Sequence, residues 1–232
     1  MFERVAGLLC FRGLPFGLLA ASALWTTALW TTALWTMSTA CLAQQPGQVD
    51  LQRSRAYVRI GATGLGHEHG AEGRLKSGVL VLGANASAGE LVFDMTTFAT
   101  ETAASRAYVG LGGGSDASTA AKVTANMLSS EVLNVAKYPL ATFRIRSSAA
   151  LPKRQPSDPQ SYQLDGDFTL HGVTKPLQVI AAAEQLGALV HLRGQFSVRQ
   201  TQFGITPYSK AFGAVGVADE LKIWGDLWVT AR

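Results

Sequence analysis

Apolar and polar residues alternate along most of the chain after residue 54, and turn-forming residues interrupt this alternation at intervals. A period of two places every second side chain on the same face, which is typical of strands with one buried face. The pattern therefore predicts a mainly β protein whose antiparallel strands form a barrel or a sandwich. The predicted strands cover residues 55–62, 73–82, 90–98, 141–148, 162–171, 177–184, 188–200 and 220–231.

One segment, residues 118–135, has helical spacing instead. Apolar residues including Val123 and Met127 recur there on one face, as expected for a helix packed against a sheet. Asp116 or Ser118 can cap its first turn, and Pro139 prevents its continuation. The sequence thus predicts eight strands and one helix, and eight strands suffice for a barrel that is filled or holds one small ligand.

Glycines occupy the centre of the apolar face in three predicted strands, at Gly166, Gly194 and Gly225. A glycine inside a strand marks a bend or a close approach, and barrel corners need such bends. The same glycines also predict empty volume among large apolar side chains, and so an apolar cavity. Strand phase alone does not choose between these two interpretations, which are compatible with each other.

The first 43 residues differ in composition from the rest. Arg4 and Arg12 supply positive charge, an apolar run over residues 14–35 follows, and the small-residue sequence Cys41-Leu42-Ala43 ends the segment. This order predicts a cleaved signal peptide over residues 1–43 and export to the periplasm. An uncleaved membrane anchor and a lipid-modified Cys41 are the alternatives.

The remaining chain divides into a polar lead-in over residues 44–54 and one domain over residues 55–232. Both cysteines of the sequence precede residue 44, so the exported chain has neither a disulfide nor a thiolate ligand. The net charge of +4 is mild, and the basic residues are scattered rather than clustered. This distribution argues against a nucleic-acid partner.

The segment "GHEHG" at residues 66–70 is the strongest candidate for a metal site. In an extended chain His67 and His69 point the same way, as two imidazole ligands require. Glu72 falls in the opposite strand phase, and a third ligand has to come from elsewhere, such as His171 or His191. A metal-dependent barrel enzyme that uses His67 and His69 is therefore the alternative hypothesis, whereas the leading hypothesis has no metal.

Other candidate catalytic groups have simpler interpretations. Asp165 and Asp167 share the polar face of a predicted strand, where solvation explains them. Ser115 lacks the strand–turn–helix context of an activated nucleophile. His171 ends a strand, Gly172 permits a positive φ, and Pro176 lies in the returning strand, so this stretch predicts a hairpin rather than a catalytic centre.

Three stretches resemble the YceI family of exported, isoprenoid-binding proteins. They are "TLHGVTKPLQV" at residues 169–179, "NMLSSEVLNVAKYPLATF" at residues 126–143 and "QTQFGITPYS" at residues 200–209. The resemblance covers residues 57–232 in family order. The sequence departs from the common family form in "GHEHG" and in the glycine-rich loop before the predicted helix.

The resemblance implies an eight-stranded antiparallel lipocalin-like barrel with one helix over an opening. It also implies a periplasmic, non-catalytic carrier for a long apolar amphiphile, such as an isoprenoid quinone or a polyprenyl lipid, that needs no cofactor. Transient membrane contact is compatible with this function. Strand phase places the following side chains inside as cavity lining: Phe93, Met95, Phe143, Ile145, Leu164, Phe168, Leu170, Leu192, Phe196, Val198, Ile223 and Leu227.

Overall fold

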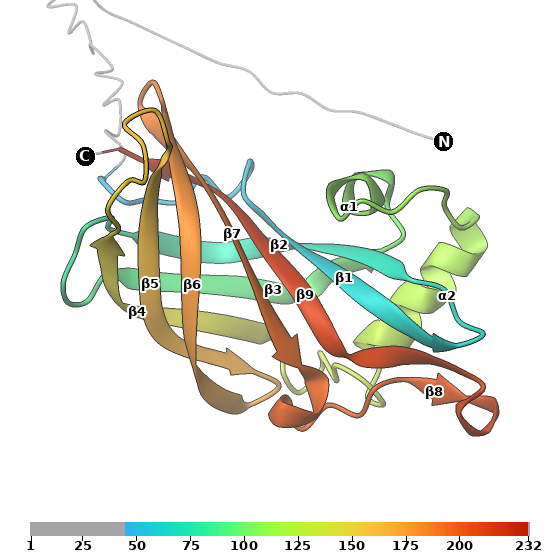
Figure 1. Cartoon of the computed structure of the whole chain (residues 1–232). Coiled ribbons are helices and arrows are strands. Elements are labelled where there is room, and N and C mark those ends of the chain that lie inside the picture. Colours follow the sequence, from blue (N-terminus) through green and yellow to red (C-terminus); the bar gives the residue numbers. More distant parts are fainter. Residues whose placement is uncertain (1–44, 232) are drawn as a thin grey trace, which may run out of the picture. The chain divides into compact units, whose positions relative to one another are not determined.

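Eight strands of the computed structural model close into an antiparallel barrel (Figure 1). The structure describes residues 45–231, and the predicted signal peptide and Cys41 lie outside this range. A ninth, two-residue strand, β8, extends the sheet beside β9. The strands are β1 (Arg55–Gly64), β2 (His69–Leu80), β3 (Gly89–Thr100), β4 (Leu140–Ala150), β5 (Gln160–Leu170), β6 (Val173–Leu186), β7 (Leu189–Arg199), β8 (Ser209–Lys210) and β9 (Val215–Thr230).

The barrel closes because the first and last strands pair with each other. Ala56 of β1 lies opposite Gly225 of β9, and Val58 lies opposite Ile223. From β1 to β7 each strand pairs with its neighbour in sequence, and β9 then completes the circle by pairing with both β7 and β1. Closure gives each of the eight strands a partner on both sides, although pairs such as β6–β7 are joined over only part of their length. This arrangement reduces the usual risk of edge-to-edge aggregation.

The β5–β6 connection confirms the predicted hairpin. Leu170 pairs with Val173, so His171 and Gly172 form a two-residue loop. Both have positive φ, at 52° and 77°, which is the geometry of a type I′ turn. The His171 ring packs against Tyr138, and its Nδ1 lies 3.3 Å from the carbonyl oxygen of Phe203. His171 thus serves the turn and its packing.

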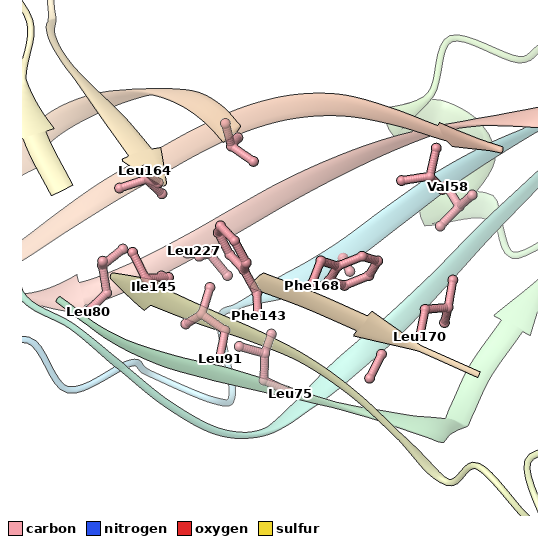
Figure 2. Packing of buried hydrophobic residues seen from close by; sticks show 14 of the residues in the cluster. Val58, Leu75, Leu80, Leu91, Phe143, Ile145, Leu164, Phe168, Leu170 and Leu227 are labelled. Carbon is pink, nitrogen blue, oxygen red and sulfur yellow. The ribbon is translucent and has the colours of Figure 1, made fainter. Parts of the chain in front are cut away.

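The core is made by the inward faces of the strands, in the phase that the alternation predicts. Leu80, Ile145 and Leu192 are almost completely buried. Figure 2 shows core side chains converging inside the barrel from different strands, with Ile145 and Leu164 in one part and Phe168 in another. Burying one side chain of this size contributes about 1.5–3 kcal/mol to stability.

Two helices lie between β3 and β4, where the sequence pattern predicts one. The helix α2 (Ala117–Leu128) begins after Asp116, whose carboxylate accepts hydrogen bonds from two backbone N–H groups of the first turn. It ends at Leu128 rather than at residue 135. The Ser129 hydroxyl donates to the carbonyl of Asn126 at 2.7 Å, and such local bonds favour helix ends over helix interiors.

The helix α1 (Ala103–Tyr108) is too short for a periodic apolar stripe, so the pattern did not predict it. It is capped by the Thr102 hydroxyl, which accepts from the Ser105 backbone N–H at 2.9 Å. In the part of the chain that the structure describes, no helix combines the length and hydropathy needed to cross a bilayer.

Two irregular segments pack against the ends of the barrel. In the lead-in, Val49 is buried in the core and forms a bridge with Val229 of β9. Between β7 and β8, the 3-10 helix η1 (Gln200–Phe203) ends at Gly204, whose φ is +69°. Phe203 and Ile205, on either side of this glycine, are both buried.

Candidate functional site

The larger of two apolar cavities in the barrel has a volume of about 200 Å³ and lies beside α2. Strand side chains such as Val58, Phe93 and Ile223 line it, and Val123 and Met127 of α2 cover it from one side. In Figure 1, α2 lies across one end of the barrel, which agrees with the prediction of a helix over an opening. An apolar cavity of about 150 Å³ is already large enough to bind benzene.

A second, smaller cavity of about 50 Å³ lies beside the first. It is lined by apolar side chains such as Leu91, Leu164 and Leu177. The two cavities share four lining residues, which therefore form the boundary between them. These shared residues are Phe93, Phe168, Phe196 and Gly225.

Aromatic side chains form most of this boundary. The Phe168 ring contacts Phe196 and Phe203 edge to face, with centroid distances of 5.8 and 5.7 Å. Phe168 and Phe203 are buried, whereas Phe93 and Phe196 are only partly buried. Edge-to-face packing on two sides stabilises the Phe168 position. Phe93 and Phe196 are less buried and therefore have more room to move.

Small residues lie beside Gly225, the fourth shared lining residue, on the neighbouring strands. Ala56, Gly225, Gly194 and Ala181 lie side by side in register on β1, β9, β7 and β6. A Cβ at Gly225 would meet only Leu227, at 4.0 Å, so this position borders open space. A Cβ at Gly194 would lie 2.9 Å from a Val179 methyl group, which shows close packing there.

Gly166 is also explained by close packing, because a Cβ there would collide with the carbonyl oxygen of Arg144 on β4. Both interpretations of the three strand glycines therefore apply, each at different positions. Gly166 and Gly194 permit close approach of neighbouring strands, whereas Gly225 leaves volume empty.

Polar groups gather at one edge of the larger cavity, around His69, Thr100, Asn126, Gln200 and Tyr208. Gln200 Nε2 donates to the carbonyl of Ala218 at 2.8 Å. Burial lowers the pKa of the His69 imidazole, and the charges of His67 and Arg106 add to this, although Glu101 opposes it. The His69 ring is therefore neutral at pH 7.

Comparison with known families identifies the domain. A family model described as the YceI-like domain matches residues 48–227. This chain belongs to that family. The match begins inside the segment that we expect to be a lead-in, close to Val49, which packs into the core of this YceI-like barrel. A comparison with curated proteins finds no match.

One solved structure shares this fold. A polyisoprenoid-binding domain from Saccharophagus degradans, implicated in plant cell wall breakdown, is 11% identical to the chain, with a TM-score of 0.54. The alignment covers 81% of this chain and all of that domain. BcnA from Burkholderia cenocepacia is 18% identical over 78% of this chain and 99% of its own, with a TM-score of 0.49. The predicted fold class is confirmed, since the Saccharophagus domain shares the barrel.

The structure places ten of the twelve predicted lining residues beside a cavity of this YceI-like domain. Only Ile145 and Val198 line neither cavity, although both are buried in the core. Whether the ten contact a ligand stays a prediction. They are Phe93, Met95, Phe143, Leu164, Phe168, Leu170, Leu192, Phe196, Ile223 and Leu227.

Several lining residues were not predicted, and some of them lie outside the strands of the structure. Asn126 and Met127 belong to α2, Gln200 to η1, and Tyr208 to the segment before β8. The apolar stripe of the predicted helix was a usable signal for Met127. No local pattern identifies Tyr208, which reaches the cavity only through the path of the chain after η1.

The structure also separates the groups considered for catalysis. Glu72 accepts a hydrogen bond from the Thr102 hydroxyl at 2.6 Å. His191 Nε2 lies 2.7 Å from Asp226 Oδ1, and His171 lies in its hairpin, so neither completes a site with His67 and His69. Instead Glu101, from the end of β3, meets His69.

The two strand carboxylates are tied to polar neighbours. Asp165 accepts hydrogen bonds from Gln163 and Gln178, and these lower its pKa. Asp167 pairs with Arg146 of β4. Neither carboxylate lines a cavity among residues 45–231, and both have the surface roles expected from strand phase.

Proposed function

We propose that this protein is a periplasmic carrier that binds a long apolar amphiphile, such as an isoprenoid quinone or a polyprenyl lipid, without catalysing a reaction on it. The observation that carries the proposal is the pair of adjacent apolar cavities that share Gly225 and three phenylalanines as lining residues. Family membership and the polyisoprenoid-binding domain of the same fold support it. Export is supported by the basic and then apolar order of the first 43 residues.

The cavity dimensions specify how such a ligand would fit. Small-molecule pockets usually measure roughly 300–1,000 Å³, and the two cavities together are smaller than this. A long chain must therefore occupy both cavities and displace side chains between them. Phe93 and Phe196 are suited to this movement, because each lines both cavities and is only partly buried.

Hydrocarbon transfer supplies the binding energy in this arrangement. At about 25 cal/mol per Å², burying roughly 300 Å² of an apolar tail contributes roughly 7 kcal/mol before ordering costs. The polar edge of the larger cavity, which includes His69 and Gln200, would face the ligand's polar end. The site thus matches an amphiphile better than a pure hydrocarbon.

The proposal predicts that the purified protein carries a long-chain lipid. Mass spectrometry of an organic extract should identify one dominant amphiphile in a near-stoichiometric amount. The control is the Gly225→Leu variant, expressed in the same host strain and extracted in the same way. The extract of this variant should lack the amphiphile. A wild-type protein that neither carries nor takes up any isoprenoid or other long-chain lipid would contradict the proposal.

Transient contact with a membrane is also part of the proposed function. Leu65 is 86% exposed, and Phe212 and Val215 are exposed too. The backbone N–H of Leu65 donates to the Ala214 carbonyl at 2.8 Å, so these side chains lie at neighbouring tips. The cavity-lining Tyr208 accepts a backbone hydrogen bond from Val217 nearby, which places the tips beside the cavity's polar edge.

Replacing Phe212 by Ser should weaken binding to lipid vesicles by about tenfold or more. Inserting a phenylalanine into an apolar phase contributes about 1.5–3 kcal/mol, and serine cannot replace it. Co-sedimentation with vesicles measures the effect. Leu186→Ser is the matched control, because Leu186 is exposed at the opposite end of the barrel. Equal binding by Phe212→Ser and wild type would contradict membrane contact through this tip.

A further inference from the structure

Two histidines and a buried glutamate converge at the start of β2. His67 comes from the β1–β2 loop, His69 opens β2, and Glu101 follows β3. Each offers one ligand atom, and these three atoms all lie within 4.8 Å of one another. The proximity depends on the β2–β3 pairing, because Glu101 lies 32 residues after His69 in the sequence.

The Glu101 side chain is fully buried, and three polar side chains hold its carboxylate in place. Its Oε2 accepts hydrogen bonds from Arg106 Nη1 at 2.8 Å and from Ser115 Oγ at 2.9 Å. Its Oε1 lies 3.1 Å from His69 Nδ1. Although burial raises the pKa of Glu101, the bonds from Ser115 and His69 and the Arg106 charge outweigh it and lower the pKa.

The backbone at Glu101 is also unusual, which points to a defined role for the side chain. Its φ is +63°, a conformation that is uncommon for residues other than glycine. The Glu101 N–H donates to the Gly70 carbonyl at 2.7 Å, which ties this residue to β2 beside His69. Strained positions of this kind persist only where their surroundings hold them, and they cluster at functional sites.

Contacts with the buried Glu101 carboxylate account for the positions of Arg106, Ser115 and His69, but His67 makes no such contact. The His67 ring packs against His69 with a centroid distance of 4.4 Å and an angle of 56°. Among residues 45–231 the structure shows no hydrogen bond of the His67 side chain, which is exposed. One ligand atom of its ring lies within 4.8 Å of the ligand atoms of His69 and Glu101, so the three side chains can reach one ion.

We propose that His67, His69 and Glu101 bind a divalent transition-metal ion of the Zn²⁺ class. Imidazole nitrogen and carboxylate oxygen are ligands that Zn²⁺ prefers, and three protein ligands leave a coordination position open. Arg106 and Ser115 would orient the carboxylate from behind, as outer partners of metal ligands do. His69 also lines the larger cavity, so the ion would lie at its polar edge.

The test is isothermal titration calorimetry, in which ZnCl₂ is titrated into the EDTA-treated protein. Wild type should bind one ion per chain, and His67→Ala should bind it at least about tenfold more weakly, the smallest loss typical when even an outer partner of a metal site is removed. His67→Ala leaves the bonds among Glu101, Arg106 and Ser115 in place, so circular dichroism should stay unchanged. This variant therefore distinguishes a metal ligand from a member of a structural ion pair.

His171→Asn is the matched control, because it removes one of the four histidines at a position where asparagine tolerates the positive φ. It should bind Zn²⁺ like wild type. The proposal is overturned if wild type binds no stoichiometric ion, if His67→Ala binds equally well, or if His171→Asn loses binding to the same degree. The test uses the metal alone, so these outcomes leave the lipid-carrier proposal unaffected.

Discussion

Replacing Gly225 by Leu should abolish lipid uptake while the barrel stays folded. A Cβ at this position meets only Leu227 at 4.0 Å, and the two cavities adjoin there, so the leucine side chain enters empty volume. A ligand tail can then no longer pass from one cavity to the other. We expect at least a tenfold loss of affinity, or about 1.4 kcal/mol, in a fluorescence titration with a polyprenyl lipid.

Two control variants separate blockage of the cavity from loss of stability: one puts a smaller side chain at the same position, and the other puts the same side chain at a different glycine. Gly225→Ala adds only the Cβ, which fits without a close contact, so this variant should bind lipid as wild type does. Gly194→Leu should instead lower the free energy of unfolding, because its Cβ already crowds Val179. A folded Gly225→Leu variant with wild-type lipid uptake would show that the ligand does not use this passage.

Ile145→Ala should lower the free energy of unfolding by about 2–5 kcal/mol without affecting lipid binding. Ile145 is 1% exposed and lines neither cavity, so its truncation opens a new void in a tightly packed region. Urea unfolding of the lipid-free protein, followed by circular dichroism, measures the change. The folded variant should still take up lipid in the wild-type amount.

Ile223→Ala is the matched control, since it makes the same chemical change at a half-buried position that lines the larger cavity. Its stability loss should fall at or below the lower end of the range for Ile145→Ala. Its lipid affinity should change, because the substituted side chain borders the ligand. If folded Ile145→Ala lost uptake and Ile223→Ala kept it, the assignment of the cavity to these residues would be wrong.

Strand phase predicted much of the candidate site, for a simple physical reason. In a strand the side chains alternate strictly, so Leu164, Phe168 and Leu170 had to share one face. The structure places these three beside a cavity. Phase cannot distinguish a side chain that borders a void from one that fills the core, and for that reason Ile145 was grouped with Phe143.

The histidine cluster shows the opposite case. The spacing of His67 and His69 was visible in the sequence, but Glu72 and the distant histidines were the only partners considered. Glu101 meets them because β2 pairs with β3 and the chain then turns at a positive φ. No periodicity marks such a residue, since its contact depends on the register of two strands.

By itself, the sequence determined the alternation of the strands, a helix capped by Asp116 or Ser118 and a hairpin within residues 171–176, because each depends on interactions between residues close in the chain. Only the tertiary structure decided that β1 pairs with β9, that Gly225 borders empty space while Gly194 is tightly packed, and that Glu101 joins His69. These outcomes depend on which distant segments meet after closure of the barrel. Empty volume in particular belongs to no single residue, because every wall of the cavity comes from a different strand or helix.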